Sequence, residues 1–206
     1  MKITYYDLAG LIPSLNQEHP RTLLHIGCGK ADRARLPECF QDSRWQEIRL
    51  DIDPAVQPDI VSSITEMTAV DTGSMDAVWS SHNLEHLEDF QVPQALAEIR
   101  RVLKPGGFAL ITLPNLERIA QLIVEGKIDE VLYVSPAGPI TPVDMLFGHQ
   151  ASISHGNSFM AHRTGFTANR LGNKLIKAGF SEVRILPGTS FELWAVAKTQ
   201  AIQTPT

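Results

Sequence analysis

Two closely spaced glycines near the start of the chain could bind the polar part of a small ligand. Gly27 and Gly29 follow the largely apolar run Leu23–Ile26 and precede a helical pattern. Glycine lets the backbone turn sharply and approach a ligand, and free N–H groups at the start of a helix bind polar groups. A second apolar run ends in Asp51, at the distance from Gly29 where a carboxylate can bind both hydroxyls of a ribose. These residues predict a nucleoside pocket, and a tight turn beside a solvated acid is the alternative.

The third position of the glycine loop argues against a dinucleotide. A pyrophosphate needs a small residue there, and this chain has Asp32, whose negative charge would repel phosphate. The spacing therefore disfavours NAD.

Histidines are the other residues that could do chemistry. His149, His155 and His162 lie in one polar window, and His82 and His86 are four residues apart. They raise a metal hypothesis, in its strongest form a metal-dependent hydrolase that uses this window. The sequence nevertheless predicts no metal site, because the histidines are widely spaced and no HExxH motif occurs. We interpret His86 as a structural histidine.

Apolar runs that alternate with helical patterns must position these residues. This alternation is typical of an α/β fold with a doubly wound, mostly parallel sheet. Helices are predicted over Val92–Leu103, Leu116–Glu125 and Thr167–Ala178, and a turn is predicted at Lys104–Gly107. Seven strands are predicted, over Thr22–Gly27, Gln46–Asp51, Asp59–Val61, Met75–Ser80, Gly107–Leu113, Glu182–Leu186 and Phe191–Lys198.

Residues 115–165 interrupt this alternation after the fifth strand. No linker composition or repeat is visible, so we expect one domain over residues 1–206 with an insertion that folds onto it. Ligands of open parallel sheets bind at the carboxyl ends of the strands, so the insertion could form a lid over an acceptor site. Residues 148–166 are polar and glycine-rich, as binding loops are, although a solvated loop has the same composition. A basic patch could attract an anionic acceptor, and its residues would be Arg163, Arg170, Lys174, Lys177 and Arg184.

Four motifs in order resemble those of class I S-adenosylmethionine-dependent methyltransferases, of the kind called methyltransferase type 11. They are His25–Gly29, Asp51–Pro54, Ser74–Leu87 and Leu103–Gly107. The resemblance covers about residues 22–114 and implies a Rossmann-like sheet of seven strands with an antiparallel last strand. It also implies S-adenosylmethionine as the cofactor.

Carried over position by position, the resemblance implies that Gly27 and Gly29 line the methionine part of the cofactor and that Asp51 binds its ribose. Ile52 would lie against the adenine. The other cofactor-binding candidates flank these positions or follow the third and fourth strands: His25, Cys28, Asp53, Ser63, Ile64, Ser80, Ser81 and His82.

Three positions depart from the family pattern. His25 and Ser63 stand where acids are common, and Ala31 replaces a third glycine. A neutral imidazole cannot supply the negative charge that a carboxylate would offer to the ammonium group of the cofactor. A non-catalytic binding protein of the same fold is therefore the alternative to a methyltransferase.

Catalysis would need little more than alignment, because a sulfonium methyl already carries its leaving group. Where the acceptor must lose a proton, a neutral histidine is the natural base near pH 7. The preferred candidates for this base are His155 and His162, and His82 is the next choice. The sequence does not identify the acceptor, which can be a small molecule or attached to a polymer.

Composition limits the partners and the location. The chain has 206 residues, a formal net charge of -5 and no apolar run long enough to span a membrane. The acidity argues against nucleic acid as a partner. With only two cysteines, a reducing, cytoplasmic compartment is expected. The oligomeric state is left open.

Overall fold

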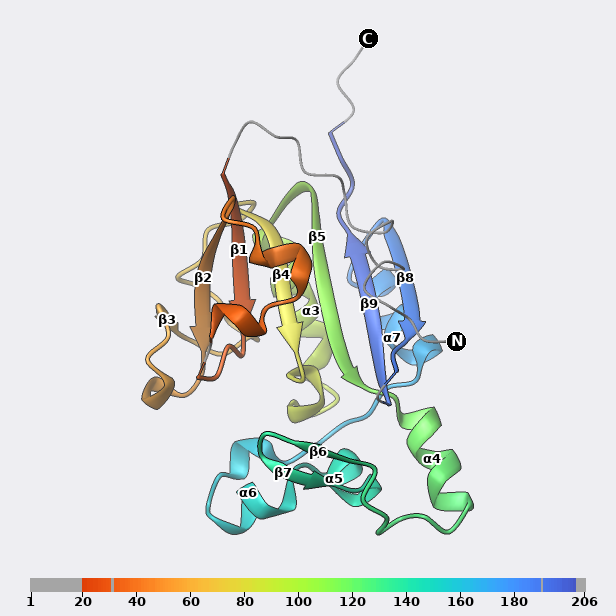
Figure 1. Cartoon of the computed structure of the whole chain (residues 1–206). Coiled ribbons are helices and arrows are strands. Elements are labelled where there is room, and N and C mark those ends of the chain that lie inside the picture. Colours follow the sequence, from red (N-terminus) through yellow and green to blue (C-terminus); the bar gives the residue numbers. More distant parts are fainter. Residues whose placement is uncertain (1–19, 31, 190, 203–206) are drawn as a thin grey trace.

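A seven-stranded sheet forms the centre of the computed structural model, which describes residues 20–30, 32–189 and 191–202. The strand order is β3-β2-β1-β4-β5-β9-β8, with β9 antiparallel to both of its neighbours and the other pairs parallel (Figure 1). This confirms the Rossmann-like sheet and its antiparallel last strand. The bounds are β1 Arg21–Ile26, β2 Trp45–Asp51, β3 Ile60–Val61, β4 Met75–Ser81, β5 Leu103–Pro114, β8 Glu182–Pro187 and β9 Glu192–Lys198.

One face of the sheet carries an aliphatic core under the helices α3 (Val92–Val102) and α7 (Ala168–Lys177). The apolar residues of α3 recur at helical spacing and are fully buried. The side chain of Thr167 caps α7 by accepting a hydrogen bond from the backbone N–H of Arg170. The turn predicted at residues 104–107 lies within β5, which begins at Leu103.

The other face of the sheet carries a smaller core that is rich in aromatic residues. Phe40 stacks on Phe108 and meets Trp45 edge to face. After the glycines, where the sequence has a helical pattern, the chain forms only a 3₁₀ turn, η1 (Arg33–Arg35), and a four-residue helix, α2 (Glu38–Gln41). Pro37 explains the break, since a proline disfavours helical conformation in the residue before it, and Leu36 is extended.

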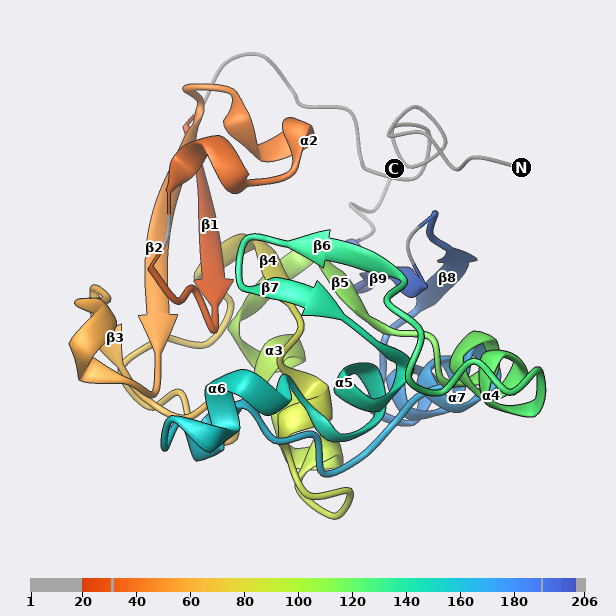
Figure 2. The ribbon, with the colours of Figure 1, turned by 60° about the horizontal axis from the view of Figure 1, so that its bottom comes forward.

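The insertion lies beyond the carboxyl ends of the parallel strands, across the lower edge of the sheet in Figure 1 and in front of it in Figure 2. Its two ends are fastened together where the N–H of Leu116 donates to the carbonyl of Phe166 at 2.9 Å. The proline- and glycine-rich segment 135–142, for which no strand was predicted, contributes to a short hairpin. The elements are α4 (Leu116–Val124), β6 (Tyr133–Ser135), β7 (Gly138–Ile140), α5 (Pro142–Phe147), α6 (Gln150–Ser154) and η4 (Ser158–Met160).

None of the helices in the described part of the chain has both the length and the apolar character that a membrane span requires.

Candidate functional site

A cavity of about 300 Å³ lies where β1, β2 and β3 end. Its lining includes seven of the predicted cofactor-binding residues: Gly27, Gly29, Asp51, Ile52, Asp53, Ser63 and Ile64. The insertion contributes residues that the sequence did not single out for the cofactor: Asn157, Phe159, Met160 and Arg163. Three strand ends and the insertion therefore meet around one pocket.

Asp51 joins the loops that follow β1 and β2. Its carboxylate is nearly buried, and it accepts the backbone N–H of Gly29 at 2.8 Å and that of Asp53 at 2.9 Å. Each carboxylate oxygen has a second lone pair, so Asp51 can still accept bonds from a ribose diol. Hydrogen bonds from both loops therefore hold the Asp51 carboxylate in one orientation.

Asn83 is a site residue that sequence reasoning missed. Its side-chain amide donates to the carbonyl of Ile26 at 2.9 Å and lies directly over Gly27. A Cβ at Gly27 would lie 1.6 Å from Asn83 Oδ1, and Gly27 has φ +60, so this position requires glycine. The available signal was that Asn83 follows a strand end within the Ser74–Leu87 motif.

A second cavity, of about 750 Å³, lies between the aromatic face of the sheet and the insertion. Trp79 and Trp194 form part of its wall, with their rings stacked 5.6 Å apart. The predicted residues Ser81, His82 and His162 line it. His86 and Met160 line both cavities, so the two cavities are neighbours at these side chains.

Comparisons with known proteins agree with this geometry. Residues 24–111 match the family of methyltransferase domains. A search of curated proteins found no match.

Solved structures resemble the chain over nearly its whole length. A SAM-dependent methyltransferase from Archaeoglobus fulgidus is 18% identical, with a TM-score of 0.59 over 95% of this chain and 92% of that one. A 1,6-didemethyltoxoflavin-N1-methyltransferase from Burkholderia thailandensis, solved with 1,6-didemethyltoxoflavin and S-adenosylhomocysteine, is 17% identical, with a TM-score of 0.52 over 88% and 72%. A possible exported protein from Bordetella parapertussis is 14% identical, with a TM-score of 0.57 over 96% and 66%.

Residues 24–111 therefore match a methyltransferase domain, and the chain has the fold of S-adenosylmethionine-dependent methyltransferases. The cofactor of this class is S-adenosylmethionine, and the smaller cavity suits it. Gly29 has φ +55 and open space where its Cβ would be, which leaves the loop backbone accessible to a ligand. Ile52, half exposed beside Asp51, offers an apolar surface to a base.

Five of the candidate cofactor residues lie outside the lining of the smaller cavity. His25 Nδ1 is 2.8 Å from Glu47 Oε1, and burial lowers the pKa of this histidine despite that carboxylate. Cys28 is buried, which raises the pKa of its thiol, and Ser80 is fully buried in β4. Ser81 and His82 line the larger cavity instead. Ala31 lies outside the described residues.

A buried carboxylate lies at the centre of the histidines. Glu85, in η3 (Leu84–His86), is 1% exposed, and its Oε1 is 3.0 Å from His82 Nδ1. Burial raises the pKa of the Glu85 carboxyl, but the hydrogen bond from His82 and nearby histidine charges outweigh it and leave that pKa lowered. Burial lowers the pKa of His82, and the Glu85 bond and charge outweigh this and leave it raised. The Oε2 atom of Glu85 has no hydrogen-bond partner among the described residues, a condition that costs about 1–3 kcal/mol for a buried group.

The histidine window does not converge on one point. His162 lies beside His86, with ring centroids 4.9 Å apart. His149 lines the larger cavity and bonds to Ser152 at 2.7 Å. His155 is exposed at the end of α6, with Nδ1 on the carbonyl of Ala151, and is absent from the lining of both cavities. A hydrolase site made of all three window histidines is not assembled.

Ion pairs partly neutralise the expected basic patch. Arg163 pairs with Glu88 at 2.9 Å, and Arg170 and Lys174 both pair with Asp89. Arg184 pairs with Glu182 at 2.8 Å. Three carboxylates thus pair with four of the five cations, and the fifth, Lys177, adds a further positive charge.

Proposed function

We propose that the protein transfers a methyl group from S-adenosylmethionine, held in the smaller cavity, to an acceptor in the larger one. The observation that carries this proposal is that the two cavities are neighbours, with His86 and Met160 in the lining of both. Donor and acceptor can then approach within a space that the insertion covers, so residues 115–165 act as a lid. We also propose that the protein is located in the cytoplasm.

The residues of the smaller cavity bind and orient the cofactor. Asp51 accepts the ribose hydroxyls, the loop of Gly27 and Gly29 faces the amino-acid part, and Ile52 and Ile64 enclose the adenine. When bound, S-adenosylmethionine supplies an electrophilic methyl group on a sulfonium. The protein aligns the acceptor with the methyl group and excludes water. These two effects can account for most of the rate acceleration of a methyl transfer.

His82 is the side chain we propose as proton acceptor for an acceptor hydroxyl or ammonium group. Glu85 holds Nδ1 of the ring, which leaves Nε2 as the atom that can take the proton, and His82 lines the larger cavity. A carboxylate that orients an imidazole in this way also stabilises the imidazolium that forms. The apolar walls from Trp79 and Trp194 favour an acceptor with a flat or aliphatic part.

Thermal unfolding with S-adenosylmethionine, S-adenosylhomocysteine and NAD tests the cofactor assignment. A ligand at a hundred times its Kd adds about 2.7 kcal/mol, which for a chain of this length raises Tm by roughly 5–10 °C. Both adenosyl compounds should produce this shift, and NAD should not. If neither adenosyl compound shifts Tm, the proposed function is wrong.

Formation of S-adenosylhomocysteine over a panel of hydroxyl and amine acceptors tests catalysis. His82→Gln should lower kcat about 100-fold or more and leave the affinity for S-adenosylhomocysteine unchanged. His155→Gln is the matched control and should leave both quantities unchanged. Tight cofactor binding with no methylated product over the whole panel would favour a non-catalytic binding protein. The reason to consider that alternative is that His25 and Ser63 stand where acids are common in the family.

A further inference from the structure

The strongest unexplained feature outside the cofactor pocket is the unpaired half of a buried carboxylate. Glu85 is 1% exposed; His82 occupies its Oε1, and Oε2 has no hydrogen-bond partner in the described part of the chain. Buried carboxylate oxygens are normally satisfied by a donor or by a cation. The Oε2 atom therefore points to a missing positive partner.

Two histidines beside Glu85 are held in the manner of metal ligands. His86 Nδ1 lies 3.1 Å from the carbonyl oxygen of Ala161, and His162 Nδ1 lies 2.8 Å from that of Met145. A carbonyl oxygen only accepts, so each ring donates from Nδ1 and keeps the lone pair of Nε2 free. Histidines that bind metals usually donate their other ring N–H to a carbonyl or carboxylate in this way.

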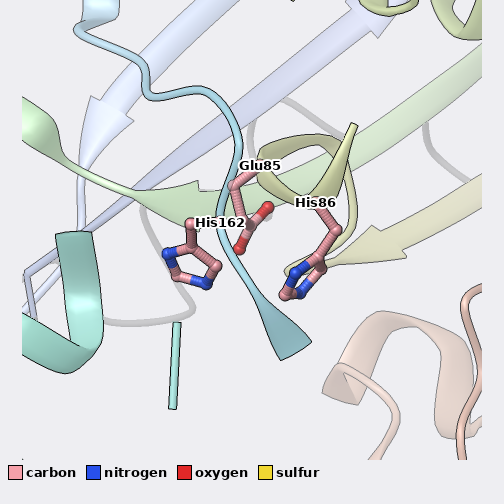
Figure 3. A group of neighbouring side chains, drawn as sticks. All are labelled: Glu85, His86 and His162. Atoms are coloured by element: carbon pink, nitrogen blue, oxygen red, sulfur yellow. The ribbon is translucent and has the colours of Figure 1, made fainter. Parts of the chain in front are cut away.

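The three side chains converge from two segments of the chain. Figure 3 shows Glu85 and His86, which follow β4, facing His162 at the end of the insertion. The two segments are fastened together by the N–H of Arg163, which donates to the carbonyl of Glu85 at 2.7 Å. One potential ligand atom from each of the three residues lies within 4.8 Å of the other two. Zinc bonds of about 2.0–2.2 Å in a tetrahedron bring ligand atoms to roughly 3.4 Å, so small side-chain shifts would close the site.

We propose that Glu85, His86 and His162 bind a divalent transition-metal ion of the zinc type. Two histidines and one glutamate form the ligand set of several catalytic zinc sites, which keep a fourth position open. His86 lines both cavities and His162 lines the larger one, so the open position faces the place where the two cavities are neighbours.

The ion gives the larger cavity a preference among acceptors. Held by Glu85, His86 and His162, such an ion would act as a Lewis acid toward an acceptor hydroxyl. The hydroxyl proton would pass to His82 while the bond from oxygen to the methyl carbon forms and the methyl carbon–sulfur bond breaks, which would release S-adenosylhomocysteine. This role rests on the proposed function, whereas the metal site itself does not. Hydroxyl-bearing acceptors are then favoured over amines.

The test is metal binding by the whole protein after removal of metals with a chelator. Zn²⁺ is titrated against a chromophoric competitor, and Co²⁺ is added separately because its visible spectrum reports tetrahedral coordination. We expect one equivalent to bind tightly, with the intense visible bands of four-coordinate Co²⁺. His162→Gln and His86→Gln should each weaken binding at least about 100-fold and abolish these bands.

His155→Gln and His149→Gln are matched controls, because these histidines lie outside the cluster, and both should bind Zn²⁺ like the parent protein. Glu85→Gln is informative only together with a check of folding by urea denaturation, whereas His162 is partly exposed and its variant reports on the site directly. Failure of the parent protein to bind, or equal binding by His162→Gln, would overturn the proposal.

Binding of S-adenosylhomocysteine is measured on the same samples. Zinc binding without binding of the cofactor would leave the metal site standing and reject the proposed function. Cofactor binding without zinc binding would reject the metal site alone.

Discussion

The two cavities share His86 and Met160 but are built in different ways. The smaller one is lined by residues that directly follow β1, β2 and β3, together with part of the insertion. The larger one lies against an aromatic face that the short helix α2 covers only partly, and most of its opposite wall comes from residues 133–162. Parallel strands bring their carboxyl ends together whatever surrounds them. The sheet therefore fixes the strand-end part of the smaller cavity, whereas the insertion shapes much of the larger cavity and one side of the smaller one.

Breaking the glycine turn should have the largest effect, and it acts on the smaller cavity alone. In Gly27→Ala the new Cβ displaces Asn83 and strains a backbone with positive φ. We expect a loss of roughly 2–4 kcal/mol in the free energy of unfolding, from the left-handed conformation and the broken buried hydrogen bonds. Urea denaturation measures it.

Gly29→Ala is the matched control for Gly27→Ala. Gly29 also has positive φ, but a Cβ there meets nothing within 4 Å. Its cost should be about 1 kcal/mol, the backbone penalty alone. Equal losses in the two variants would show that the contact between Gly27 and Asn83 does not support the turn.

Substituting one carboxylate in each cavity tests which cavity binds the cofactor. Asp51→Asn should weaken S-adenosylhomocysteine about 10-fold to 100-fold, since hydrogen bonds to a charged group contribute roughly 1.5–3 kcal/mol. Glu192→Gln, in the wall of the larger cavity, should leave this affinity within about twofold. Calorimetric titration measures both, and a weaker complex with Glu192→Gln would mean that the cofactor extends into the larger cavity.

The histidine in β1 should produce a smaller, pH-dependent effect. Burial lowers the pKa of His25. As the pH falls through about 6.5, this imidazole therefore becomes protonated in the unfolded chain but stays neutral in the folded chain. The stability due to His25 is therefore present above this range and is lost as pH falls below about 6.5. One such group contributes a slope of at most about 1.4 kcal/mol per pH unit.

The contribution of His25 is measured by comparing urea midpoints of the parent protein and His25→Gln between pH 7.5 and 5.5. The variant should lose less stability than the parent over this interval. A steeper loss in the variant would mean that Glu47 holds His25 protonated and would give β1 a positive charge under the smaller cavity.

Much of the smaller cavity was predicted from the sequence because its residues occupy positions defined relative to strands. Gly27, Asp51 and Ser63 each follow an apolar run whose period and length identify a strand. His25 and Cys28 fall in the same motif yet lie outside the lining, because a side chain in or beside a strand can face the core as well as the pocket. The helical pattern after the glycines yields only the short α2, because Pro37 disfavours helical conformation in the residue before it.

By itself the sequence determined the order of the strands' motifs, the glycine turn and the acid at the tip of the second strand. These follow from local periodicity and from the conformations that particular residues permit. Only the tertiary structure decided that His162 meets Glu85 and His86, that Asn83 lies over Gly27, and that the two cavities are neighbours. Side chains distant in the chain are brought together by how an insertion packs, and no local pattern records that packing.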